Sequence, residues 1–99
     1  MNDKIKYKFS AQVWKHSSSN GWHFVSLPSD LAKEIRENLK WMELGWGQLK
    51  VAAQIGSSIW ETSIWFDLKQ NTYLLPLKAE IRQKEKIKTD KKIKVIVLI

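Results

Sequence analysis

Lys78 and Arg82 are the residues of this sequence whose type and spacing best suit ligand chemistry. They lie four positions apart and would share one face of a short helix, where two like charges repel each other. A bound phosphate or carboxylate would relieve that repulsion, and so would an internal carboxylate from Glu61 or Asp67 on a neighbouring hairpin. We therefore expect Arg82 to contact one of these two carboxylates or a bound anion, the internal pair being the simpler arrangement.

Tryptophan is the second unusual feature, because six tryptophans in 99 residues are more than a domain of this size can bury completely. Trp46 stands between two glycines in a predicted turn, and Trp65 falls on the outward face of a predicted strand. Exposed indole rings can stack on a planar ligand or anchor a protein partner, and they can also cover the rim of the fold. The candidate ligand-binding residues are Lys78, Arg82, Trp65, Trp46, Ser63 and Glu61.

No motif in the sequence predicts catalysis, a metal site or a cofactor. The chain has no cysteine, and its two histidines, His16 and His23, do not form a recognisable set of metal ligands. His16 has serine neighbours but no carboxylate placed to orient its ring, as a catalytic triad requires. The Gly45-Trp46-Gly47 run is too short for a phosphate loop and precedes a predicted strand. We therefore predict no catalytic residue, no metal ligand and no cofactor, and a binding protein rather than an enzyme.

The charge of the chain favours an anionic partner. The net charge is +7, and residues 78–94 hold eight Lys or Arg against three acids. Such a surplus is typical of nucleic-acid-binding proteins, although lysines interleaved with acids are also typical of an ordinary solvated surface. Nucleic acid is therefore an alternative partner beside a small anion or another protein.

Location and assembly follow from further absences in the sequence. Without cysteine there is no sign of an oxidising compartment, and the longest apolar run, Val95–Ile99, is too short to span a membrane. The first residues lack the apolar core of a signal peptide. We therefore expect a cytoplasmic protein without membrane contact, acting as a monomer or a weak dimer.

Hydropathy periodicity predicts a mostly β domain with two short helices. Alternating apolar and polar residues predict strands over 4–14, 22–27, 48–55, 59–67, 73–75 and 92–99, the first two forming a hairpin. A helical spacing of apolar residues predicts an amphipathic helix over 30–42, with Met42 on its apolar face, and a second helix ends near Glu85. The predicted core consists of Phe9, Leu31, Ile35, Leu49, Val51, Trp60, Ile64, Leu75, Ile81, Val95 and Val97.

The chain repeats one pattern twice: a strand running into Leu-Pro, a helix carrying Ile-Arg, and a closing strand. The matching features are Leu27-Pro28 with Leu75-Pro76, Ile35-Arg36 with Ile81-Arg82, and the strand 48–55 with the strand 92–99. Two such units predict one β-barrel with internal pseudo-two-fold symmetry, in which segments of about 22–55 and 72–99 superpose. Because no linker or low-complexity tract separates them, residues 1–99 are expected to form a single domain.

Five stretches of the sequence resemble the domain-of-unknown-function family DUF1905. They are Gly21–Pro28, Gly45–Gly56, Trp60–Ser63, Tyr73–Lys78 and Ile81-Arg82, and their order and spacing match over nearly the whole chain. The resemblance implies a double-split β-barrel, related in architecture to transition-state regulators and antitoxins of the AbrB/MazE type, which build the barrel from two chains. It also implies bacterial relatives in which this domain is the front half of longer bacteriocin-protection proteins of the YdeI/OmpD-associated type.

One turn departs from the family pattern, because relatives tend to carry Gly-Asp before the last strand and this chain has Asp90-Lys91. Aspartate tolerates a left-handed backbone better than most residues, so the turn can still form.

Together these features predict a non-catalytic binding module for a small anionic ligand or a protein partner. Nucleic-acid binding through the basic surface is the alternative prediction, and an enzyme of unknown reaction is the third.

Overall fold

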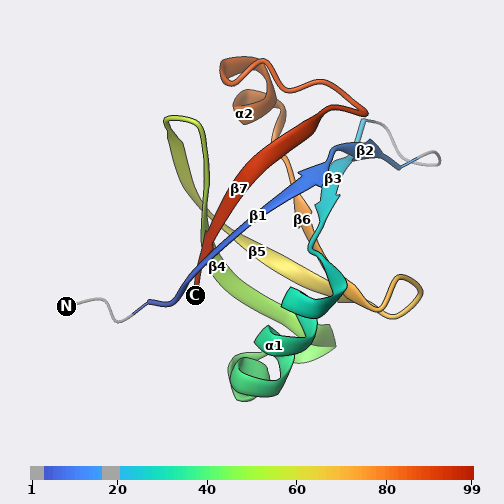
Figure 1. The fold of residues 1–99 in the computed structure, drawn as a ribbon, viewed down its shortest axis with the longest axis vertical. Helices are drawn as coiled ribbons and strands as arrows, with labels where there is room; N and C mark the ends of the chain where they lie inside the picture. Colours follow the sequence, from blue (N-terminus) through green and yellow to red (C-terminus); the bar gives the residue numbers. More distant parts are fainter. Residues whose placement is uncertain (1–3, 17–20) are drawn as a thin grey trace.

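The computed structural model describes residues 4–16 and 21–99, and in this part of the chain seven strands form one sheet that curls into a barrel (Figure 1). The strands are β1 Lys6–Gln12, β2 Trp14–Lys15, β3 His23–Ser26, β4 Gln48–Ile55, β5 Ser58–Asp67, β6 Thr72–Pro76 and β7 Lys92–Leu98. The helical segments are α1 Ser29–Leu39, the 3₁₀ turns η1 Lys40–Met42 and η2 Gly45–Gly47, and α2 Ala79–Lys84. The fold is mostly β with two short helices, as predicted.

The sheet closes on itself through its first strand. The strand order is β1-β7-β4-β5-β6-β3-β2, and only Val13 separates β1 at one edge from β2 at the other. The predicted hairpin of the first two strands is therefore wrong for most of its length: β2 pairs with β3, but β1 pairs with β7. The chain crosses from one partner to the other at Val13, whose backbone bonds the loop before β7 through Asp90 and Lys91.

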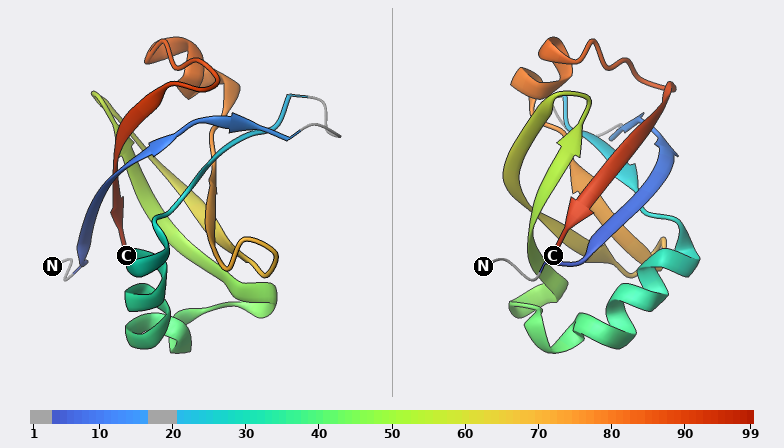
Figure 2. Two further views of the ribbon diagram at one scale, coloured as in Figure 1. Left: turned by 45° about the vertical axis from the view of Figure 1, so that its right-hand side comes forward. Right: turned by 60° about the vertical axis from the view of Figure 1, so that its left-hand side comes forward.

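Pseudo-two-fold symmetry shows in the register of the sheet. In the pair β4–β7, Ala53 lies opposite Val97, and these residues are equivalent in the aligned closing strands. In the pair β3–β6, Ser26 lies opposite Leu74, its equivalent when the two Leu-Pro exits are matched. A two-fold axis requires equivalent residues to face each other in this way, and α1 and α2 lie at opposite ends of the barrel (Figure 2). The predicted symmetric barrel is confirmed.

The core fills the barrel with the inward residues of each strand. Of the predicted core residues, eight are buried, and Phe9, Leu31 and Trp60 are partly buried against them. Tyr7 and Tyr73 also lie in the core. Alternation along each strand therefore identifies the inward face correctly.

Two local features bear on further predictions. Helix α1 ends at Leu39, and the chain then tightens into η1. The tighter turn rotates Met42 away from the apolar face of α1, so it is 39% exposed and its predicted place is wrong. Asp90 has φ 71°, so the turn before β7 does place an aspartate in the left-handed region.

Candidate functional site

Four of the predicted ligand-binding residues meet in one groove. Glu61, Ser63, Trp65 and Lys78 line a depression of about 430 Å³, which we call the Lys78 groove; the remaining lining residues are Lys50 and Thr62. The register of β4 and β5 explains the grouping, because Lys50 lies opposite Ser63 and Gln48 lies opposite Trp65 on the outward face. Ser63 is held there by Gln48, whose Nε2 donates to its Oγ at 3.0 Å.

Arg82 lies in an adjacent cleft of about 320 Å³, the Arg82 cleft, which it lines together with Lys78 and Trp22. Among the described residues it forms no ion pair with Glu61 or Asp67, so the predicted internal pair is wrong. Its Nε instead donates to the carbonyl oxygen of Leu77 at 3.2 Å. The other arm of the prediction, a bound anion, stays a prediction.

The position of two acids explains why that ion pair does not form. Asp67 stands at the far end of β5, where its Oδ2 accepts a hydrogen bond from the backbone N–H of Gln70 at 3.1 Å. Glu61 lines the Lys78 groove but not the Arg82 cleft, and Lys78 is the residue that the two share. Trp46 is in the turn η2, and its side chain is outside the part of the structure that is described.

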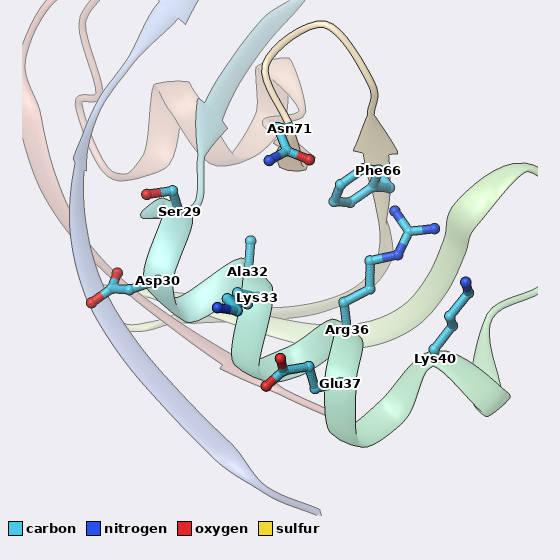
Figure 3. Close-up of a pocket in the computed structure, with 9 residues that line it drawn as sticks. All are labelled: Ser29, Asp30, Ala32, Lys33, Arg36, Glu37, Lys40, Phe66 and Asn71. Atoms are coloured by element: carbon cyan, nitrogen blue, oxygen red, sulfur yellow. The ribbon is translucent and has the colours of Figure 1, made fainter.

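A larger cleft, which the sequence analysis missed, lies between α1 and the end of β5 (Figure 3). Its volume is about 630 Å³, and we call it the α1 cleft. It is lined by Ser29, Asp30, Ala32, Lys33, Arg36, Glu37, Lys40, Phe66 and Asn71. The amphipathic pattern of α1 causes this arrangement, because burying Ala32 and Ile35 in the core turns the polar side chains along the cleft.

Arg36 is the most constrained cation of the α1 cleft. Its guanidinium carbon lies 3.8 Å from the centre of the Phe66 ring, a cation–π contact. Its Nε lies 3.7 Å from Oε2 of Glu43, which is the one ion pair among the described residues. Within that part of the chain the two terminal Nη groups of Arg36 have no hydrogen-bond partner. The guanidinium is therefore held at one end and available at the other.

A buried tyrosine fixes the carboxylate that holds Arg36. The hydroxyl of Tyr73, which is fully buried, donates a hydrogen bond to Oε2 of Glu43 at 2.5 Å. Burial raises the pKa of Tyr73 above its ordinary value, and the hydrogen bond to Glu43 raises it further. The Tyr73 ring also meets Phe66 edge to face, with centroids 5.2 Å apart. One buried residue, Tyr73, therefore supports both contacts of Arg36, the one with Glu43 and the one with Phe66.

The two clefts are lined by equivalent arginines of the repeated pattern. Arg36 and Arg82 occupy the same place in the repeated Ile-Arg pattern, and each is held through its Nε, by Glu43 or by the Leu77 carbonyl. An aromatic residue lines each cleft, Phe66 in one and Trp22 in the other. The repeat was therefore the signal that could have located Arg36. It matches Ile35-Arg36 with Ile81-Arg82, so a candidate role for Arg82 applies equally to Arg36.

A comparison with protein families agrees with this architecture. The family model described as "Domain of unknown function (DUF1905)" matches residues 9–97. The chain belongs to the DUF1905 family. No curated protein matches the chain. Because the DUF1905 description assigns no activity, the geometry of the clefts is the basis on which a function can be proposed.

Proposed function

We propose that this DUF1905 domain is a binding module whose α1 cleft takes a small anionic ligand. The observation that carries the proposal is Arg36, whose guanidinium is fixed by Phe66 and Glu43 while its Nη groups have no partner among the described residues. A guanidinium fixed in this way suits a carboxylate or phosphate, because its planar fork can donate two parallel hydrogen bonds. Little side-chain entropy would then be lost on binding.

The charge and shape of the α1 cleft support this class of ligand. Three cations line it against two acids, and Figure 3 shows Arg36 and Lys40 pointing to the side of Phe66 while Glu37 points away. The ring of Phe66 provides an apolar wall for the non-ionic part of a ligand. The volume of about 630 Å³ lies within the usual range for small-molecule sites. An organic anion with a planar or apolar body therefore fits better than a bare ion.

A binding role is favoured over catalysis by what the residues of the α1 cleft can do. Its ionisable side chains are lysines, one arginine and two acids, and no serine–histidine pair lines it. A carboxylate on a protein partner could bind the same arginine, Arg36, so the proposal also covers a protein ligand. We expect the domain to act in the cytoplasm. Among the described residues, no helix is long and apolar enough to cross a membrane.

Site-resolved titration tests the proposal with two probes, benzoate and inorganic phosphate. We expect benzoate to shift the backbone NMR signals of Ala32 and Asn71 in the α1 cleft. Arg36→Lys keeps the charge but loses the planar fork, and it should weaken benzoate binding about 10- to 100-fold, the range for charge-assisted hydrogen bonds. Phosphate should bind more weakly than benzoate, because it cannot use the apolar wall.

The matched control is Arg82→Lys, the same change in the equivalent helix. It should leave the benzoate shifts at Ala32 and Asn71 unchanged. Shifts confined to Gly21 and Ala79 would instead place the anion in the Arg82 cleft and overturn the assignment to α1.

A further inference from the structure

A different surface, the outer face of the paired strands β1 and β7, carries a row of exposed lysines. The outward pairs of this ladder are Lys6 with Leu98, Lys8 with Ile96, Ser10 with Lys94, and Gln12 with Lys92. Each of these four successive rows contains one lysine and no acid, and all four lysines are exposed. We call this surface the lysine ladder. In the sequence these lysines lie in two segments more than 80 residues apart, and the register of β1 and β7 brings them together.

The surroundings of the lysine ladder do not neutralise it. On the β4 side the outward neighbours are Ala52 and Gln54, which are uncharged. At the loop end the nearest acid in sequence is Asp90, followed directly by Lys91. A shallow groove of about 510 Å³ runs along the middle of the ladder, with Lys8, Ser10 and Lys94 in its lining. β1 and β7 pair over the full length of both strands (Figure 2, right), so the rows form a continuous strip.

We infer that the lysine ladder binds the phosphate backbone of a nucleic acid. Successive outward rows of a strand are about 6.8 Å apart, so the four rows form a strip about 20 Å long, with two lysines on β1 followed by two on β7. A strip with one positive charge in each row matches a polymer that repeats one negative charge per unit.

The chemistry of the ladder predicts binding without sequence preference. Lysine contacts phosphate as a point charge, and phosphate contacts position a protein on nucleic acid without reading bases. The ladder itself offers no aromatic side chain in its outward rows. We therefore expect the oligonucleotide affinity to depend strongly on salt and weakly on base composition.

The test measures the salt dependence of binding to a fluorescent single-stranded oligothymidine by anisotropy. Four phosphate contacts predict a slope of log K against log salt of about −2.8. The double variant Lys8→Gln/Lys94→Gln should lower its magnitude to about 1.4. The control Lys69→Gln/Lys84→Gln removes the same charge from exposed positions outside the ladder and should keep the original slope.

Three outcomes would overturn the inference. They are no saturable binding at about 50 mM salt, an equal fall in slope for both double variants, or competition by polyglutamate as effective as that by unlabelled oligothymidine. The inference is independent of the α1 cleft. Arg36→Lys should bind the oligonucleotide as the unaltered protein does, so failure of one proposal leaves the other measurable.

Discussion

The hydroxyl of Tyr73 connects the hydrophobic core to the proposed site. Tyr73 is fully buried, yet its hydroxyl donates to the carboxylate of Glu43, which in turn holds Arg36. A carboxylate that is largely removed from water is tolerated only when it is paired and hydrogen-bonded, and Glu43, whose side chain is 9% exposed, has both partners. The function proposed for Arg36 therefore depends on a residue that touches no ligand.

Replacing Tyr73 by Phe tests this connection at neutral pH. Tyr73→Phe preserves the ring but leaves Glu43 without its donor, and it should cost about 1.5–3 kcal/mol, the range for hydrogen bonds to charged groups. Urea denaturation at pH about 7 measures the loss. A change below about 0.5 kcal/mol would show that Glu43 is satisfied by water instead.

The same substitution should change the response of stability to alkaline pH. Because folding raises the pKa of Tyr73 above 10.0, the stability linked to its proton is complete below pH 10.0 and is lost as pH rises beyond it. The unaltered protein should therefore lose more stability than Tyr73→Phe between pH about 9 and 11. Tyr7, whose pKa burial also raises, is present in both proteins and does not affect the difference. Parallel stability curves would contradict the expectation.

The β4–β5 turn shows how two elements are joined. Glu85, just after α2, accepts hydrogen bonds at Oε2 from Ser58 and Ser57 of the turn, and the Ser58 bond chiefly lowers the pKa of Glu85. Gly56 in this turn has φ 58°, and a Cβ there would overlap the Glu85 carboxylate. The turn therefore needs glycine both for its conformation and for its contact with Glu85.

Gly56→Ala should consequently destabilise the protein. A left-handed backbone costs alanine about 1–2 kcal/mol, and displacing Glu85 adds to this. Gly45→Ala is the matched control, because Gly45 has no positive φ and open space around its Cβ position. It should change the free energy of unfolding by less than about 0.5 kcal/mol. Equal losses for the two variants in thermal denaturation would show that the turn relaxes freely.

The whole molecule is a cycle of two similar halves that is opened at one place. Ile5 and Ile99 exchange backbone hydrogen bonds of 3.0 and 2.8 Å, just as Ile55 and Ser58 pair across the β4–β5 turn. The symmetry makes these two pairs equivalent. A turn connects Ile55 to Ser58, whereas Ile99 and Ile5 lie side by side without a turn between them.

This equivalence predicts that a circular permutant will fold. In this permutant a short glycine linker joins Ile99 to Lys4, and the chain is opened between Gly56 and Ser57. The turn and the chain break then change places between the two equivalent sites. We expect a native-like circular dichroism spectrum and cooperative unfolding, because closing a short loop costs little. A permutant opened between Val51 and Ala52, inside the central strand β4, should not fold. Equal behaviour of the two permutants would contradict the cyclic description.

Much of the fold was predictable because it depends on local periodicity and on the repeat. The inward positions of β4 and β7, including Leu49 and Val95, follow from alternation alone. The grouping of Ser63 and Trp65 was predictable for a similar reason, since alternation placed both on one outward face of β5. The pairing of β1 with β7 was not predictable. A strand with one apolar face can bury that face equally well beside either neighbouring strand, so its pattern does not identify its partner.

The sequence by itself determined which face of each element is buried, that two similar units build one barrel, and which family the chain belongs to. Only the tertiary structure decided which side chains became partners. Arg36, Glu43, Phe66 and Tyr73 come from four elements or connections, and barrel closure brings them together. Likewise, the Nε of Arg82 donates to the backbone carbonyl of Leu77 and not to a carboxylate. The physical reason is that burial is set by each residue's own hydropathy, whereas a polar contact requires two residues to meet, and the register and curvature of the sheet decide where they do.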